Sequence, residues 1–187
     1  MWLLPACPSP GRATLACVPT HLIAPLEPDD ALDVAHAYAA MQACTYATWA
    51  TAGFSSLVFA DMDRRVRSLK EADVCMVAKN DRGNVIGLAV AQDGPEWWER
   101  PHDDDFVWPA TNRTLSSLFT MPEAHGTGLG HALLEAALPD DEPAYLWVMR
   151  RNPRAVRFYA KHGFVPDGYT KRTLGWGDMD LLRMVRQ

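Results

Sequence analysis

The stretch RTLSSLFTMPEAHGTGLGHALLEAAL, residues 113–138, decides the fold of this chain. Residues 113–121 mix apolar side chains with Ser and Thr, and Pro122 ends this strand because proline cannot continue a ladder of hydrogen bonds. From Leu129 onward the apolar residues recur at helical spacing. The pattern therefore predicts a strand, a glycine-rich loop at residues 125–130 and a helix.

The loop carries glycine at three alternate positions, Gly126, Gly128 and Gly130. Glycine tolerates the backbone angles of a sharp turn, and uncovered N–H groups can then point together at one anionic group. The following helix adds the positive end of its dipole, and residues 126–133 contain no acid that would repel an anion. The loop is a candidate phosphate cradle. The alternative is a plain turn that joins a strand to a packed helix.

The glycine spacing excludes the two commonest nucleotide loops. A dinucleotide fingerprint needs glycines at i, i+2 and i+5, but counted from Gly126 or Gly128 the last position falls on His131 or Leu133. A Walker A loop ends in Gly-Lys-Ser or Gly-Lys-Thr, and this loop has no lysine. A phosphate ligand of another class is therefore expected.

A second informative stretch is YLWVMRRNPRAVRFYAKHGF, residues 145–164. Its first five residues are apolar, as in a buried central strand. Asn152 is a good N-cap, Pro153 suits the first helical position and Gly163 is a natural stop, which predicts a helix over residues 153–162. Asn152 and Tyr159 then lie about two turns, or about 10 Å, apart on one face, so both can reach one elongated ligand.

With these two stretches the sequence resembles the GCN5-related N-acetyltransferases, the GNAT family, which move an acetyl group from acetyl-CoA to an amine. The acetyl-CoA loop of that family is usually written Q/R-x-x-G-x-G/A, and here it reads HGTGLG from His125. His125 replaces the usual Gln or Arg, a change that weakens a side-chain contact more than the backbone cradle. The second family motif, N-x-x-A-x-x-F-Y followed by G-F, is matched by Asn152, Ala155, Phe158, Tyr159, Gly163 and Phe164.

The resemblance implies an α/β (α+β) fold with a mixed, mostly antiparallel sheet of six to seven strands. About four helices are expected to flank this sheet, and its two central strands are expected to splay apart. The resemblance also implies acetyl-CoA as co-substrate, with no metal. The residues implied in its binding are Leu118, Phe119, Thr120, His125, Gly126, Thr127, Gly128, Leu129, Gly130, Asn152, Ala155 and Phe158.

The chemistry of acetyl transfer points to Tyr159 as the catalytic residue. The leaving thiolate needs a proton, and a phenol placed beside the sulfur can give one as the thiolate forms. A strand N–H near Phe119 or Thr120 can stabilise the negative charge on the carbonyl oxygen. The alternative for Tyr159 is aromatic packing on an amphipathic helix.

The general base is left open by the sequence. Many family members carry a glutamate on the central strand, but residues 113–121 contain no acid. The candidates are water held by Ser116 or Ser117, and three side chains of an acidic, tryptophan-rich region, namely Glu96, His102 and Asp104. That region, residues 92–110, is either a solvated acidic hairpin or a site that attracts an ammonium group.

Length and composition indicate one domain. The chain has 187 residues, and 48% are hydrophobic, which suffices for one full core. We predict a disordered tail at residues 1–18 and a single acetyltransferase domain at 19–187. Prolines in the tail argue against a secretory signal, no apolar run is long enough to cross a membrane, and the four cysteines form no CxxC pair. A reduced, cytoplasmic protein is expected.

The remaining elements follow from periodicity and turn signals. Strands are predicted at residues 20–24, 74–78, 85–91 and 177–186, and a turn into a variable stretch at 165–168. A helix is predicted from the acidic caps at 27–30 to about residue 49. A second, continuous helix is predicted at 56–71 with Phe59 facing inward. By resemblance, Tyr46, Trp49 and Phe54 either border the acceptor pocket or pack in the core.

The expected function is transfer of the acetyl group of acetyl-CoA to a primary amine of a small molecule, by direct attack in a ternary complex. One alternative is a catalytically inactive domain that binds acetyl-CoA, favoured by the missing strand glutamate. Another is an unrelated nucleotide-binding or structural domain. The net charge of −5 argues against nucleic acid as a partner, and no membrane partner is expected. A homodimer is an open alternative to a monomer.

Overall fold

The computed structural model describes residues 21–96, 98–99, 106–173 and 176–187. The predicted tail at residues 1–18 lies outside the described residues, as do the base candidates His102 and Asp104.

The described chain forms one seven-stranded sheet in the order β1-β2-β3-β4-β5-β7-β6. All neighbouring strands pair antiparallel except β4 and β5, which pair parallel. This mixed, mostly antiparallel sheet confirms the predicted fold class. The strands are β1 (His21–Pro25), β2 (Val74–Asn80), β3 (Val85–Asp93), β4 (Arg113–Thr120), β5 (Ala144–Met149), β6 (Val165–Arg172) and β7 (Asp180–Arg186).

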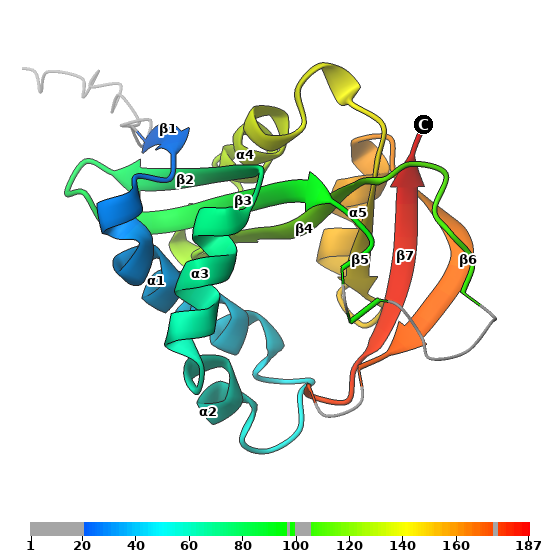
Figure 1. The fold of residues 1–187 in the computed structure, drawn as a ribbon, viewed down its shortest axis with the longest axis horizontal. Coiled ribbons are helices and arrows are strands. Elements are labelled where there is room, and N and C mark those ends of the chain that lie inside the picture. The colour runs from blue at the N-terminus through cyan, green and yellow to red at the C-terminus, as the bar shows by residue number, and fades with distance from the viewer. Residues whose placement is uncertain (1–20, 97, 100–105, 174–175) are drawn as a thin grey trace, which may run out of the picture.

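The two central strands meet at one point and then separate. The parallel pairing of β4 with β5 is limited to Thr114 opposite Tyr145. Figure 1 shows the consequence: β2, β3 and β4 lie across the picture, while β5, β7 and β6 lie roughly vertical in it. The remaining length of β4, about 20 Å at 3.3 Å per residue, therefore presents a free backbone edge where the sheet opens.

A β-bulge bends β4 close to this point. Val90 lies opposite Ser117 and Ala91 lies opposite Leu115, so Ser116 is an extra residue on β4. Its hydroxyl donates a hydrogen bond to the carbonyl of Val90, 3.3 Å away. Bulges increase local twist and re-aim the strand. The bulge therefore helps β4 to diverge from β5.

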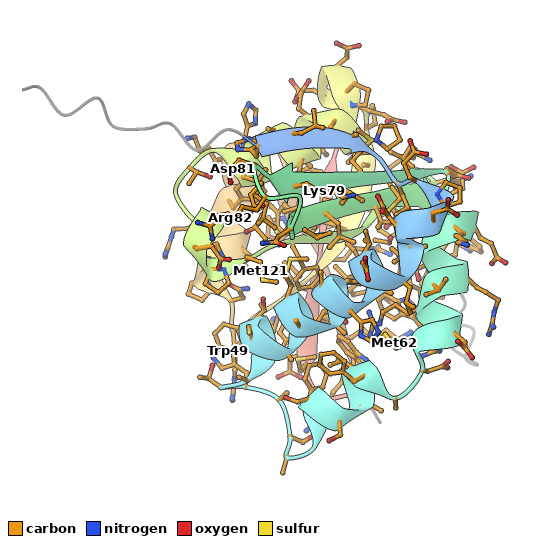
Figure 2. All side chains as sticks on the ribbon, turned by 90° about the vertical axis from the view of Figure 1, so that its left-hand side faces the viewer. Trp49, Met62, Lys79, Asp81, Arg82 and Met121 are labelled. Carbon is orange, nitrogen blue, oxygen red and sulfur yellow. The ribbon has the colours of Figure 1, made fainter. Side chains whose placement is uncertain are left out.

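Helices cover both faces of the sheet (Figure 1). On one face α1 (Ala31–Tyr46), α2 (Phe54–Phe59) and α3 (Met62–Glu71) pack together. Met62, the first residue of α3, packs against the core cluster to which α1 contributes (Figure 2). On the other face lie α4 (Leu129–Ala137) and α5 (Pro153–Lys161). Alternate residues of β3 serve the two cores, because Ala89 packs toward α4 and Leu88 toward α1. A Cβ at Gly87 would lie 2.8 Å from Leu133 Cδ1, so α4 packs closely across β3.

The prediction of one continuous helix over residues 56–71 is wrong. The chain forms α2 and α3 with a break at residues 60–61, because the Asp61 side chain accepts a hydrogen bond from the Arg64 N–H and caps a new helix. The change of axis leaves Phe59 42% exposed instead of facing the core.

The C-terminal region also differs from expectation. Residues 165–168 open strand β6 rather than a turn, and β6 pairs antiparallel with β7 on both sides of an irregularity between Pro166 and Thr170. The last strand begins at Asp180, later than the predicted residue 177. Pro166 and Gly168 hid this strand from sequence reasoning: Pro166 lies opposite Met184 of β7, and the pairing skips residues 167–169. In the part of the chain that the structure describes, no helix is long and apolar enough to span a bilayer.

Candidate active site

A cleft of about 2300 Å³ opens where β4 and β5 separate. Its walls come from β4, β5, α1, α3, α5, β6 and the glycine loop before α4. Pockets for one drug-sized ligand usually measure about 300–1000 Å³. The cleft therefore has room for an elongated ligand together with a second, smaller one.

The glycine loop stands at one end of this cleft. Gly126 and Gly128 have φ angles of +80° and +88°, a left-handed region that glycine occupies without strain. The N–H groups of Gly126, Gly128 and Gly130 have no hydrogen-bond acceptor among the described residues, and all three glycines line the cleft. These donors and the start of α4 form a place where an anion can bind.

Thr127 and Leu129 hold the loop in shape rather than facing the cleft. The Thr127 hydroxyl donates to the Ala124 carbonyl at 2.8 Å and lies 3.4 Å from the Leu129 nitrogen. The Leu129 side chain is fully buried in the core. Thr127 and Leu129 were both implied in acetyl-CoA binding, and they can offer only their backbone groups to a ligand at the loop.

His125 lies beside the loop and contacts Arg154 from α5, with Nδ1 of the histidine bonded to the guanidinium. Burial and the charge of Arg154 both lower the pKa of His125. The ring is therefore a neutral acceptor at pH 7, and the positive charge at this place belongs to Arg154.

Arg154 is one of several basic side chains at the loop end that sequence reasoning missed. Lys161, His131 and His162 also line the cleft there. His162 Nδ1 bonds to the Phe158 carbonyl and Nε2 bonds to His131 Nδ1, at 2.8 and 3.0 Å. The available signal was the recurrence of basic residues on the helix of the second motif. These groups give the loop end of the cleft an affinity for anions.

The free edge of β4 forms the middle of the cleft. Leu118, Phe119 and Thr120, three of the residues implied in acetyl-CoA binding, all line it. The Phe119 ring is held at 5.4 Å from the ring of Tyr38 and at 6.0 Å from that of Tyr46. Packing against α1 thus holds one face of the strand, while the edge that points toward β5 stays unpaired beyond Thr114.

Helix α5 supplies the opposite wall. Asn152, Ala155, Phe158 and Tyr159 line the cleft together. Asn152 Oδ1 accepts a hydrogen bond from the Ala155 N–H at 3.1 Å, which confirms the predicted N-cap.

Tyr159 is 8% exposed, and burial raises its pKa. Its ring packs on Phe158 and Phe164, with centroids 5.3 and 5.9 Å apart. Between described residues no hydrogen bond of its hydroxyl is found, and the residue lines the cleft. The phenol therefore keeps its proton near neutral pH and can give it only to a strong base placed next to it.

The other end of the cleft is aromatic, and Arg65 and Lys171 are among the cations that line it. Tyr38 shares a 2.5 Å hydrogen bond with Ser117, and the Arg65 guanidinium lies 4.6 Å from the Tyr38 ring centroid. Lys171 Nζ donates to the carbonyls of Trp98 and Glu99 at 2.6 and 2.8 Å. Tyr46, Trp147 and Trp176 complete this end.

Two of the three aromatic residues suggested for the acceptor pocket lie elsewhere. Tyr46 lines the cleft, but Phe54 is 4% exposed and packs edge-on against Trp176 in the core. Trp49 stands beyond the end of α1 (Figure 2) and lines a separate, smaller recess.

Two carboxylates of the acidic region, Glu96 and Glu99, have different surroundings. Glu96 lines the cleft, whereas Glu99 is 1% exposed. Glu99 accepts hydrogen bonds from the Tyr145 hydroxyl at 3.0 Å, from Trp147 Nε1 at 2.9 Å and from the Glu96 N–H at 3.0 Å. Within the described ranges, no three His, Cys, Asp or Glu side chains form a metal-binding group.

Comparisons with known proteins agree with this arrangement. The chain matches the model of the acetyltransferase (GNAT) family over residues 35–164. An uncharacterised N-acetyltransferase of Mycobacterium tuberculosis strain H37Rv is 32% identical over 117 residues, which are 60% of this chain and 65% of that relative. The match thus leaves about a third of the relative's length uncovered.

Two solved structures share the fold. The apo form of YjaB from Escherichia coli has a TM-score of 0.61 at 20% identity, covering 89% of this chain and 97% of that one. The PaiA N-acetyltransferase from Thermoplasma acidophilum, in complex with coenzyme A, has a TM-score of 0.56 at 18% identity, covering 88% and 98%.

Proposed function

This chain belongs to the GNAT family of acetyltransferases, and we propose that it transfers the acetyl group of acetyl-CoA to a primary amine of a small molecule. The amine attacks the thioester directly while both substrates occupy the cleft. The observation that carries the proposal is that Gly126, Gly128 and Gly130, whose N–H groups have no acceptor among the described residues, line the same cleft as the unpaired edge of β4.

The residues at the loop end fit the diphosphate of CoA. Open backbone donors at the start of a helix favour a phosphate, and Arg154 and Lys161 add positive charge nearby. The family relative solved with coenzyme A has the same fold. The free β4 edge then offers backbone partners to the amide groups of the CoA arm, which directs the thioester toward Ser116 and Ser117.

The reaction needs two proton transfers. A free alkyl amine has a pKa of about 10.4, so roughly one molecule in a thousand is nucleophilic at pH 7, and a group in the cleft must take its proton. After attack, the C–S bond breaks and the thiolate takes a proton from the Tyr159 hydroxyl. A β4 N–H near Phe119 or Thr120 stabilises the developing oxyanion.

The alternative, a domain that binds acetyl-CoA without catalysis, is favoured by the absence of an acid on β4. The size of the cleft and its aromatic far end favour the enzyme, because a CoA-binding domain has no need of room for a second substrate.

Titration calorimetry followed by an amine panel tests the proposal. We expect acetyl-CoA to bind and ATP not to bind. With amino acids, amino sugars, polyamines and peptides offered in turn, at least one class should release the CoA thiol and yield its N-acetyl product. Binding without thiol release would support the non-catalytic alternative, and no binding of CoA would overturn both.

A further inference from the structure

Glu96 differs from the other acids that line the cleft. The side chains of Asp61, Asp73 and Asp93 are well exposed to solvent. Asp93, at the exposed rim of the cleft, forms an ion pair with Arg113. Glu96 is partly buried, and its Oε2 accepts a hydrogen bond from Trp98 Nε1 at 3.0 Å. Its Oε1 has no hydrogen-bond partner in the part of the chain that the structure describes. Glu96 Oε1 can therefore accept a hydrogen bond or a proton from a ligand in the cleft.

The segment that carries Glu96 is held in place. The Glu99 N–H donates to the Glu96 carbonyl, and the Glu96 N–H donates to the Glu99 side chain, each at 3.0 Å. Lys171 binds the carbonyls of Trp98 and Glu99, and the Glu99 carboxylate is anchored on β5 by Tyr145 and Trp147. This clamp orders a loop that composition alone would describe as solvated.

Glu96 also lies close to the place where β4 and β5 separate. Its charge raises the pKa of Tyr145, a residue that lies opposite Thr114 where the two strands meet. It also raises the pKa of Tyr38, whose hydroxyl is hydrogen-bonded to Ser117. Glu96 lines the same cleft as Ser116 and Ser117 of the bulged part of β4. An amine that enters this cleft to reach a thioester held along β4 therefore shares it with this carboxylate.

The surroundings adjust the acidity of Glu96. Burial raises its pKa, the Trp98 hydrogen bond lowers it and the charge of Glu99 raises it further, with a result of about 7. The charge of Glu96 in turn raises the pKa of Tyr145 from β5 and of Tyr38 from α1. Arg65 from α3 and Lys171 from β6 are cations that line the same cleft. A general base is most effective when its pKa lies near the working pH.

We propose that Glu96 is the catalytic residue that takes the proton from the ammonium group of the acceptor. This role rests on the proposed function and completes its proton path. The ammonium proton moves to Glu96 and then to solvent, and the freed nitrogen lone pair forms the C–N bond. When the tetrahedral adduct collapses, the C–S bond breaks and Tyr159 gives its proton to the thiolate. The second N–H proton passes to solvent and the Tyr159 phenolate takes a proton back from solvent, so one turnover releases one proton in all.

The test compares Glu96→Gln with Asp93→Asn, a matched loss of one carboxylate at the exposed rim. Glutamine keeps the oxygen that Trp98 binds. With the amine identified by the panel, kcat/KM of the wild type should rise with pH with a midpoint near 7. E96Q should lose this rise and fall by about 10²- to 10⁴-fold, whereas D93N should keep both the profile and the rate. Both variants should bind acetyl-CoA as the wild type does.

Thermal unfolding provides a readout independent of activity. Because folding raises the pKa of Glu96 from 4.5 to about 7, the folded state holds a proton that the unfolded state has released, and stability falls as pH rises through this window. E96Q should therefore have a higher Tm than the wild type at pH 8, and D93N should not. A purely structural role would instead lower the Tm of E96Q.

The inference is overturned if E96Q keeps the rate and the pH profile of the wild type, even though acetyl transfer itself is established. It is also overturned if the Tm of E96Q follows that of the wild type at every pH. A wild type that binds acetyl-CoA and acetylates no amine would contradict the proposed function, and the proton-acceptor role would fall with it.

Discussion

Placing a negative charge in the glycine loop tests whether the loop holds a diphosphate. A Cβ built at Gly128 meets no atom within 4 Å, so a side chain there extends into open space beside the cleft. Asp and Asn tolerate the positive φ of this position better than other side chains. Gly128→Asp and Gly128→Asn therefore share their size and backbone strain, and the difference between them is one charge.

The magnitude follows from Coulomb's law. A carboxylate about 5 Å from one phosphate charge is repelled by about 0.8 kcal/mol in water and by about 3 kcal/mol at the effective dielectric of a protein surface. G128D should therefore bind acetyl-CoA roughly 4- to 200-fold more weakly than G128N at low salt, as measured by titration calorimetry. The difference should shrink at high salt because the charges are partly screened.

The matched control is Gly83, which has a φ of +78° and also open space around its Cβ. It lies in the β2–β3 hairpin turn, whose exposed end carries Asp81 and Arg82 (Figure 2). G83D and G83N should bind acetyl-CoA equally. Equal affinities of G128D and G128N at low salt would refute the assignment of the loop as a diphosphate cradle.

Three other changes have defined outcomes. Tyr159→Phe should leave the Kd for acetyl-CoA unchanged and reduce kcat by about 10²- to 10⁴-fold, and an unaltered kcat would remove the phenol from the mechanism. Arg154→Ala should weaken acetyl-CoA binding and reduce its salt dependence, whereas Arg82→Ala at the hairpin end should change neither. Asp167→Ala leaves the buried Arg183 without the carboxylate that lies 2.6 Å from its Nε, so urea titration should show a loss of about 3–5 kcal/mol in unfolding free energy. A loss below about 1 kcal/mol would mean that the Val107 carbonyl and the Tyr169 ring suffice to hold the guanidinium.

Short-range signals predicted the loop and cap geometry well. The positive φ angles of Gly126 and Gly128 and the Asn152 cap were predictable because each depends on residues within one turn of the position concerned. The break at Asp61 was missed because the apolar spacing of residues 56–71 is compatible with one helix, and only the cap hydrogen bond distinguishes two.

Buried charges were the main failure of sequence reasoning. Residues 92–105 contain six acids, and nothing local distinguishes Glu99, which is buried, from Asp93, which is 79% exposed. The distinction depends on Tyr145 and Trp147, about 50 positions further along the chain. Arg183 is buried on β7 for the same reason, because its partner Asp167 belongs to the neighbouring strand.

The amino-acid sequence alone was sufficient to predict the strand, the glycine loop and the helix, and to identify the family. These features depend on apolar spacing and on backbone conformations that neighbouring residues determine. The divergence of β4 from β5, the bulge at Ser116 and the position of Glu96 in the same cleft as Tyr38 were decided by packing between segments far apart in the chain. Burial and charge at a site depend on which distant side chains exclude water from it, and this information exists only after the chain has folded.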